Sequence, residues 1–595
     1  MTIERRAAGV LALIAPIAAA AAAIALIAFS LRSYEVLKRY LDTFASDGDA
    51  EAFTRGLFAS LVVSSRLAAV ALIGVAGVLS FARKGVERAV ASILSSTIGD
   101  AASAIGEDIQ TLRAETAWHL AALVSIVTLG VVLRVRALGQ PINYDEAFTY
   151  IQYASRPFFV GWSDYSYPNN HLLHTLLVHV STRLFGTALW AVRIPAVVAG
   201  CAAIPLSYAV ARRLTGRREG LIVAALTAVS QAMITFSVVA RGYSILVAFF
   251  LLAISCAFAI VVTRSRVPWT LFTCVTAAGF VTVPVFLYPY GGMMLWLLWA
   301  GLRDRRNRAL RPGAIILSAA WTVALTAACY APAAATTGLQ SGLDYALPIA
   351  PSGFGASLSA LTNAAADVFR GLPVALVVAL VASAALAITQ RWRTAVGILP
   401  VAIVIVPAVL VPIQGKLAPA RAWIYLLPVL FVYAAAGVVS AAEWIASFAA
   451  RTAAPALAGA LAAAFALAVT AHALTHRPTR YAEWPSRSGV YGDTDLDEVA
   501  NYLRASLTPQ DALVVASGDE YPLEYYLRLH DVPLAPFKNP PRHPKRLVVL
   551  ANETRHYPVA RVLASRAVNF QDAMQPRLLR TFAYSSVYEI ELPEP

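Results

Sequence analysis

Two adjacent carboxylates, Asp145 and Glu146, stand in the segment "PINYDEAFTY", directly after a long apolar run. Ionisable groups are costly near membrane hydrocarbon, and those that occur there usually serve function. One carboxylate could act as a general base on a hydroxyl group. Neighbouring helical residues point about 100° apart, so the other could bind a metal or fix an element instead. The plain alternative is that both acids are simply solvated. Tyr144, which precedes them, is a candidate substrate-binding residue.

A second polar cluster follows in "YSYPNNHLLH", where Asn169, Asn170 and His171 are candidate substrate-binding residues. The alternative is a loop and a helix start, with one of the asparagines as the N-cap. Two tyrosines of "VFLYPYGG", Tyr288 and Tyr290, are expected at the same level of the membrane and complete this candidate set. Tyrosines at a membrane interface are more often ordinary belt residues.

Three cations interrupt apolar runs at their predicted outer ends. Arg241 is followed by Tyr243 in "VVARGYSIL", and Lys416 and Arg421 lie in "PIQGKLAPARAWIYLLP". Arginine side chains at span ends can simply snorkel to the interface. Three external cations would also suit an anionic lipid headgroup, because a phosphate is well held by point charges and by bidentate guanidinium groups. We therefore predict that these four residues bind a donor phosphate.

The elements that position these residues are predicted to be membrane helices. Of the 595 residues, 58% are hydrophobic and only 14% are charged, and apolar runs long enough to cross a bilayer recur along the chain. The fold class is therefore an α-helical polytopic membrane protein. We predict about thirteen spans, near residues 7–30, 57–82, 117–137, 190–212, 220–239, 243–263, 268–287, 288–302, 314–331, 371–390, 395–412, 422–441 and 455–475.

The charge distribution predicts the orientation of these spans. The net charge of +14 belongs to the apolar part, because residues 476–595 carry nearly equal numbers of acidic and basic side chains. The excess is concentrated in short loops at 211–219, 264–266, 303–311 and 391–393, which the positive-inside rule places in the cytoplasm. No basic face belongs to a soluble domain, so a nucleic-acid partner is excluded. The segments with the candidate residues then lie outside the cytoplasmic membrane.

Three parts of the chain differ in composition. Residues 1–116 form a two-span N-terminal extension, and residues 117–475 form the core, with external loops at 138–189 and 332–370. Residues 476–595 alternate amphipathic helical segments ("DLDEVANYLRAS", "PLEYYLRLH") with apolar strands ("DALVVAS", "KRLVVLAN"). This alternation predicts a small extracytoplasmic α/β domain.

From about Ala117 to His476 the sequence resembles the GT-C membrane glycosyltransferases, in particular the family of protein O-mannosyltransferases and lipid A aminoarabinose transferases (glycosyltransferase family 39). The resemblance rests on an ordered set of segments: "YDEAFTY", "YPNNHLLHTLLVHVSTRLFG", "WAVRIPAVVAG", "ARRLTGRREGLIVAALTAVS", "ARGYSI" and "GKLAPARAWIYLLP". It implies a GT-C fold, a polyprenyl-phosphate sugar donor in the membrane, an acceptor hydroxyl and inversion at the anomeric carbon.

The resemblance also implies roles for individual residues. Asp145 matches the proposed catalytic base and Glu146 its neighbour, whereas Lys416 and Arg421 match the region that meets the lipid phosphate. Arg241 with Tyr243 matches a site-facing pair.

One element departs from the family pattern. Many relatives carry an "HPP"- or "EKP"-like element where this chain has "PNNH". Cofactor use is therefore left open: a divalent metal would take Glu146 or His171 as its candidate ligands, with Asn170 as a local neighbour.

Two functional classes remain after this comparison. The first is a glycosyltransferase that serves a cell-envelope glycan, lipid or protein acceptor. The second is a transporter or flippase of a lipid-linked sugar, which would use the same external cations without a base. Transporters often show internal repeats and mid-membrane polar groups. The sequence has no evident repeat, and its polar groups gather at one face, which favours the enzyme.

Overall fold

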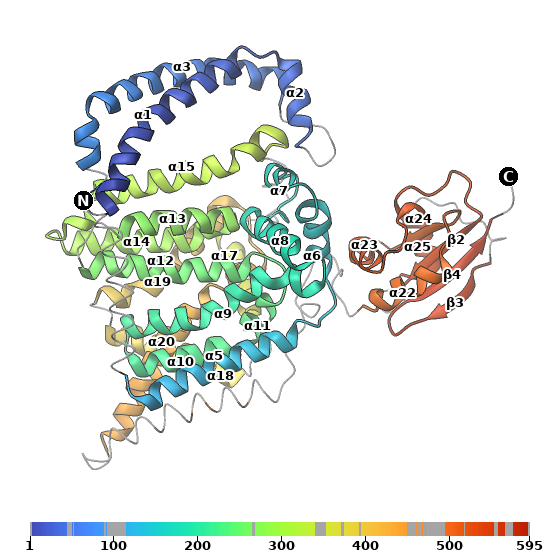
Figure 1. Cartoon of the computed structure of the whole chain (residues 1–595). Helices are drawn as coiled ribbons and strands as arrows, with labels where there is room; N and C mark the ends of the chain where they lie inside the picture. The colour runs from blue at the N-terminus through green and yellow to red at the C-terminus, as the bar shows by residue number, and fades with distance from the viewer. Residues whose placement is uncertain are drawn as a thin grey trace.

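The computed structural model describes residues 3–44, 53–88, 115–263, 268–339, 353–369, 374–391, 394–448, 494–516, 518–552, 557–565 and 575–592, with a few single positions between them. Within these ranges ten helices are long and apolar enough to cross a membrane. They form an elongated bundle, and a small α/β unit lies at one end of it (Figure 1). The ten are α1 (Ile3–Ser30), α3 (Arg55–Phe81), α5 (Ala117–Ala137), α9 (Leu189–Leu214), α12 (Tyr243–Thr263), α14 (Leu287–Arg303), α15 (Pro312–Thr336), α18 (Val374–Arg391), α19 (Ala395–Gln414) and α20 (Leu426–Ala446).

The multi-pass helical architecture is confirmed, and two of the predicted spans differ in form from a single long helix. The span predicted at 220–239 is two helices, α10 (Arg217–Val229) and α11 (Gln231–Ser237), bent by 58° at Ser230. The span predicted at 268–287 is the 15-residue helix α13 (Pro268–Thr282), which is followed by a 3-10 turn, η2 (Pro284–Phe286). Counting the bent pair as one span gives up to eleven. The predicted span at 455–475 lies outside the described ranges.

The bend between α10 and α11 is stabilised by a buried arginine. A break inside a bilayer leaves carbonyl groups at the end of the first helix without intrahelical partners. Arg134 of α5 donates to the carbonyl oxygens of Thr227 (3.2 Å) and Ala228 (3.1 Å), and to the hydroxyl of Ser237 (3.2 Å). The guanidinium thus satisfies the end of α10 and contacts α11. This bend sets the direction of the segment that carries Arg241.

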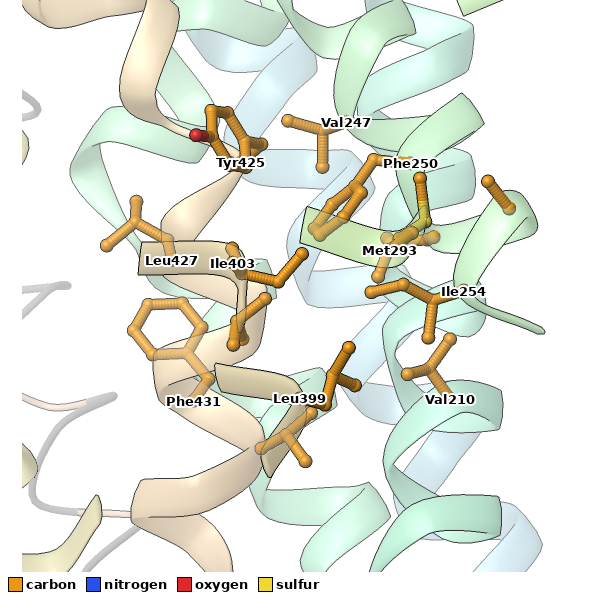
Figure 2. Close-up of a cluster of buried hydrophobic side chains, with 14 of the residues drawn as sticks. Val210, Val247, Phe250, Ile254, Met293, Leu399, Ile403, Tyr425, Leu427 and Phe431 are labelled. Atoms are coloured by element: carbon orange, nitrogen blue, oxygen red, sulfur yellow. The ribbon is translucent and has the colours of Figure 1, made fainter. Parts of the chain in front are cut away.

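Apolar packing between α12, α14, α19 and α20 forms the centre of the bundle. Figure 2 shows Phe250, Met293, Ile403 and Phe431 among the side chains that meet there. Helices α14 and α19 approach closely at Gly292, where a Cβ atom would lie 2.7 Å from the Cα atom of Ile403. The segments that carry the candidate residues adjoin the ends of these helices, so the packing of the helices fixes where those segments begin.

The N-terminal hairpin packs α1 against α3 at the edge of the bundle that α15 borders (Figure 1). The short helix α2 (Tyr34–Asp42) joins the two and is capped by Ser33, whose hydroxyl accepts from the Val36 amide. The turn after α2 meets the core, because the Phe44 and Phe159 rings pack edge to face and the Ser163 hydroxyl donates to the Phe44 carbonyl at 2.7 Å.

The remaining helices of the core are short. The segment after α5 contains α6 (Tyr144–Thr149), a π-helical turn η1 (Tyr150–Ala154), α7 (Phe158–Ser163) and α8 (Leu172–Phe185). Helix α17 (Phe354–Asp367) and the 3-10 turns η3 (Arg308–Leu310) and η4 (Ala420–Trp423) complete the set. The 14 residues of α8 are too few for a typical span.

The C-terminal unit is built around a four-stranded sheet in the order β1-β2-β4-β3. Strands β1 and β2 are parallel, with Ala512 opposite Leu547, and the other pairs are antiparallel. The two predicted strands and two predicted helices are present as β1, β2, α22 and α23, which confirms the small α/β unit. The elements are α22 (Leu496–Ser506), β1 (Ala512–Val515), α23 (Glu520–Leu529), α24 (Ala535–Lys538), β2 (Arg546–Ala551), α25 (Val559–Ser565), β3 (Arg577–Thr581) and β4 (Ser586–Glu591).

Helix α23 connects this unit to the segment between α5 and α9 through hydrogen bonds. The Tyr525 hydroxyl donates to the Thr187 carbonyl at 2.8 Å, and the Tyr526 hydroxyl accepts from the Ile142 amide at 3.1 Å. Figure 1 shows α23 as the helix of this unit that faces α6. The C-terminal unit therefore contacts the same segment that carries the two carboxylates.

Candidate active site

A capping box fixes the start of α6. The side chain of Asn143 accepts from the Glu146 amide at 3.1 Å, and the Glu146 carboxylate accepts from the Asn143 amide at 3.1 Å. This reciprocal pair satisfies two amide groups that the first helical turn leaves without partners. Asp145 thereby becomes the second residue of a defined helix, with a fixed direction for its side chain.

The Glu146 carboxylate is held in a fully buried ion pair. Its two oxygens accept from Nε and Nη2 of Arg193, at 2.9 and 2.8 Å, and neither side chain is more than 1% exposed. The guanidinium also donates to the carbonyl oxygens of Leu138 (2.7 Å), Gln140 (2.7 Å) and Pro141 (3.1 Å). Arg193 therefore ties α9 to both ends of the turn that leads into α6.

A second segment joins the same carboxylate, because the Ala240 amide donates to Glu146 at 2.5 Å. The oxygens of Glu146 thus accept from Arg193, Ala240 and Asn143. A base or a metal ligand needs a lone pair that points toward substrate or metal, and this geometry leaves none. The structure therefore favours the positioning role for Glu146 over the catalytic and metal-binding roles that the sequence suggested.

Asp145 lies where four segments of the chain meet. Its carboxylate accepts from the side-chain amide of Asn169 at 3.1 Å and lies 3.4 Å from Nη2 of Arg421. The same guanidinium donates through Nε to the Tyr243 hydroxyl at 2.8 Å. The carboxylate of Asp145 is 8% exposed and the Arg421 side chain 22% exposed. A buried acid with an adjacent, more accessible cation is therefore the polar centre of the site.

Arg241 stabilises the segments around this polar centre. It is 1% exposed and donates through Nη1 to the Thr149 hydroxyl (2.8 Å) and the Asn169 carbonyl (2.7 Å). Those bonds connect the end of α6 to the segment that carries Asn169. Arg241 therefore holds together the two segments that contact Asp145, and this geometry favours a positioning role over the predicted phosphate contact.

His171 is enclosed by the same arginine. Its Nδ1 accepts from the Gly242 amide at 2.9 Å, and its Nε2 lies 3.2 Å from Nη2 of Arg241. Burial, followed by the nearby Arg241 cation, lowers the pKa of His171 well below its usual value, so the ring is neutral. A neutral imidazole has one lone-pair nitrogen, and Gly242 already occupies it.

Neither of the two candidate metal ligands is placed to bind a divalent ion. The lone pairs of the two candidate ligands, Glu146 and His171, already accept hydrogen bonds from protein donors. Across the part of the chain that the structure describes, no three His, Cys, Asp or Glu side chains gather at metal-binding distance. The neighbouring Asn170 instead holds its own loop, donating to the Gly161 carbonyl at 2.8 Å and the Asp164 carbonyl at 2.5 Å.

Tyr144 belongs to an aromatic group between α6 and α23. Its ring lies 6.1 Å from that of Phe148 and meets the Tyr521 ring edge to face at 5.4 Å. Burial raises the pKa of its hydroxyl, and the charges of Glu520 and Asp145 act in the same direction. The side chain is half-buried, so it remains available as a wall of the site.

The other two tyrosines lie apart from each other. The Tyr288 hydroxyl donates to the side chain of Gln414 at 3.0 Å, and its ring packs on Trp423 at 4.9 Å, so it supports the segment that carries Lys416 and Arg421. Tyr290 packs instead among α13 rings, 5.2 Å from Phe280. It is not brought to the site, because helix residues two positions apart point to opposite sides of the helix.

Lys416 lies two residues after Gln414, the last residue of α19. Gly415 adopts a left-handed conformation (φ 60°), which glycine tolerates better than other residues. The side chain of Lys416 is half-buried, and five residues later the same segment presents Arg421 to Asp145. The segment between α19 and η4 therefore carries two partly exposed cations, Lys416 and Arg421.

Sequence reasoning missed Arg193 as a functional-site residue. It lies in the apolar run "LWAVRIPAVVAG", where a cation is costly unless it is paired. That cost indicates that Arg193 has a buried acidic partner, but nothing in the sequence indicates which acid the partner is. The α23 residue Tyr521 was missed for a different reason, since it reaches the site from the C-terminal unit.

A protein-family model described as dolichyl-phosphate-mannose-protein mannosyltransferase matches residues 169–330. This range includes Asn169, His171, Arg241 and Tyr243. Among curated protein sequences none matches this chain.

Several solved structures resemble the chain. ArnT from Cupriavidus metallidurans bound to undecaprenyl phosphate gives a TM-score of 0.52 at 12% identity, covering 80% of this chain and 98% of that one. The same protein in the apo state gives 0.49 at 13% identity, covering 78% and 97%. Oligosaccharyltransferase AglB from Archaeoglobus fulgidus, in complex with an inhibitory peptide and a dolichol-phosphate, gives 0.43 at 16% identity, covering 72% and 61%. The likeness to undecaprenyl-phosphate-bound ArnT shows a shared fold, and the predicted fold class is confirmed.

Proposed function

We propose that this chain, which has the fold of the GT-C membrane glycosyltransferases, is an inverting glycosyltransferase. It moves a sugar from a polyprenyl-phosphate donor to a hydroxyl group of a cell-envelope glycan, lipid or protein. The observation that supports the proposal is the 3.4 Å contact of the buried Asp145 carboxylate with the more accessible Arg421, because the proposed reaction needs an acid as general base and a cation for the phosphate in one site.

The chemistry follows from that pair. Asp145 accepts the proton of the acceptor hydroxyl, and the hydroxyl oxygen attacks the anomeric carbon from the face opposite the phosphate. The bond between the anomeric carbon and the phosphate oxygen breaks, and its electron pair leaves with the polyprenyl phosphate. Arg421, aided by Lys416, stabilises the negative charge that develops on that oxygen. Attack from the opposite face inverts the anomeric configuration.

The exposure of the cations supports this division of roles. Arg421 keeps 22% of its side chain exposed and so can meet a lipid phosphate without leaving Tyr243. Arg241 is enclosed and spends Nη1 on Thr149 and the Asn169 carbonyl. We therefore assign donor contact to Lys416 and Arg421, and loop support to Arg241.

The site is proposed to act at the outer face of the cytoplasmic membrane. Figure 1 places α6 and the C-terminal unit at the same end of the bundle. Helix α9 runs from α8 at that end to the basic loop at 211–219, which therefore lies at the opposite end. The positive-inside rule assigns that basic end to the cytoplasm.

A transporter of a lipid-linked sugar is the second candidate. It would use Lys416 and Arg421 to hold the phosphate but would have no use for a buried base. The burial of Asp145 and its fixed position through the capping box favour the enzyme, because a residue that only attracts phosphate should not be an acid.

The test uses the full chain purified in detergent, with a panel of short-chain polyprenyl-phosphate sugars and a crude envelope acceptor. The proposal predicts acceptor-dependent release of polyprenyl phosphate from one donor. If one donor binds tightly and no donor in the panel is cleaved, the transferase proposal is overturned and the transporter is favoured. Reconstitution into vesicles then checks donor movement across the bilayer.

A further inference from the structure

The C-terminal unit contains a cleft next to the helix that faces the site. Its volume is about 340 Å³, at the lower end of the range for small-molecule sites. It is lined by the carboxyl end of β1, the start of α23 and the short helix α24. The side chains that give it chemical character are Glu520, Tyr521, Phe537 and Lys538.

The two rings and the two charges form a mixed surface. The Lys538 ammonium lies 5.7 Å from the Tyr521 ring centre and 5.3 Å from that of Phe537. Aromatic faces offer an apolar surface to the C–H face of a sugar ring, and the carboxylate of Glu520 can accept hydrogen bonds from sugar hydroxyl groups. The Lys538 ammonium supplies donors at the same place.

The charge balance disfavours an anionic ligand. Lys538 already forms an ion pair with the buried Glu524 at 2.5 Å. Glu520 adds a second negative charge on the cleft wall. Glu524 also pairs with Arg528 at 2.7 Å, so the two acids and the two cations balance, and a phosphate would gain little net attraction. A neutral molecule with many hydroxyl groups suits this surface better.

Tyr521 connects the cleft to the catalytic segment. Its ring contacts Phe148 at 4.7 Å and Tyr144 at 5.4 Å, and its hydroxyl accepts from the side-chain amide of Gln152 at 2.9 Å. Tyr144 directly precedes Asp145 in α6. The charges of Glu520 and Asp145 both raise the pKa of Tyr144, so both carboxylates lie within electrostatic range of one hydroxyl.

We propose that this cleft binds a neutral sugar unit of the acceptor, so that the acceptor is a carbohydrate whose reacting hydroxyl lies toward Asp145. This inference rests on the proposed transferase function, because it identifies the acceptor of that reaction. One sugar unit stacks on Phe537 and Tyr521, and the adjoining part of the glycan reaches the base past Tyr144.

Binding is tested by saturation-transfer NMR on the full chain in a detergent without a sugar headgroup. The probes are two neutral trisaccharides, one of α-linked mannose and one of α-linked arabinofuranose. We expect at least one probe to bind, and Phe537→Ala to weaken binding by about tenfold or more. The matched control is Phe582→Ala, because Phe582 is also a half-buried ring of this unit with an arginine over its face.

A second variant covers misfolding of Phe537→Ala. Glu520→Gln keeps an oxygen for the Gly518 amide but removes the charge, and it should weaken trisaccharide binding by severalfold while the fold is unchanged. Failure of both probes to bind the wild type overturns the inference, as does equal weakening by Phe582→Ala. Displacement of a bound probe by inorganic phosphate also overturns it.

Donor turnover is measured in parallel, so that the two proposals can fail separately. If the wild type releases polyprenyl phosphate but binds neither trisaccharide, the transferase survives and the carbohydrate cleft is refuted. If a trisaccharide binds in a Phe537-dependent way but no donor is cleaved, the cleft stands and the transferase is refuted.

Discussion

The buried pair of Glu146 and Arg193 gives the sharpest structural prediction. Arg193→Met keeps much of the side-chain volume but removes five donated hydrogen bonds, two to Glu146 and three to carbonyl oxygens of the turn before α6. It leaves a carboxylate that is 0% exposed without its counter-charge. Breaking a buried ion pair from one side costs about 3–5 kcal/mol.

That cost should appear as local opening of α6. A large membrane protein does not unfold as one two-state unit, so the readout is hydrogen exchange of the α6 amides. A loss of about 3–5 kcal/mol corresponds to a fall in amide protection of about two to nearly four orders of magnitude. The matched control is Arg183→Met, because Arg183 lies at the exposed end of α8. Glu146→Gln combined with Arg193→Met should recover part of the protection, because it removes the unpaired charge.

Exchange of the α6 amides in Arg193→Met at the rate of the Arg183→Met control would refute a stabilising role for the ion pair. Such a result would mean that Glu146 finds water or another donor at little cost. The positioning role assigned to Glu146 would then have no energetic basis.

Three further predictions concern neighbouring residues. Gly242→Ala should lower turnover at least tenfold, because its Cβ atom would lie 2.9 Å from Nδ1 of His171. The control Gly313→Ala, which has open space around the new Cβ atom, should leave turnover unchanged. Equal turnover in the two variants would contradict this prediction. Burial lowers the pKa of His174 to about 3, below its usual 6.5, so stability should be complete above pH 6.5 and fall as the pH drops toward 3. His174→Leu should reduce that acid sensitivity in a pH series of thermal melts, and an unchanged slope would exclude His174 as a cause. Lys416→Gln with Arg421→Gln should raise the donor KM by about tenfold or more, and an unchanged KM would remove both from the donor site.

Much of the scaffold follows from sequence pattern alone. Ten of the thirteen predicted spans coincide with single helices long and apolar enough to cross a membrane, since length and hydropathy decide membrane insertion with little help from tertiary structure. Strands β1 and β2 were predictable because "DALVVAS" and "KRLVVLAN" are short apolar runs between turn residues. Strand β3, "RLLRT", is mostly exposed and carries two arginines, so it has no such signal.

The break at Ser230 and the arrangement of the site were not predictable in this way. A continuous apolar run gives no sign of a 58° bend, which depends on Arg134 reaching from another helix. The sequence placed Asp145, Asn169 and Arg421 on one face, but not in contact. Their meeting depends on Arg193 and Arg241, which fix the intervening segments through contacts distant in the chain.

The most direct test of the account compares wild type with Asp145→Asn in a single-turnover assay of polyprenyl phosphate release, using the donor that the panel identifies. Asparagine keeps an oxygen for the side-chain amide of Asn169 but cannot accept the proton. We expect a fall in the release rate of about 10²–10⁴-fold, with donor affinity and α6 amide protection close to wild type. Near-normal release by Asp145→Asn would contradict the assignment of Asp145 as the base.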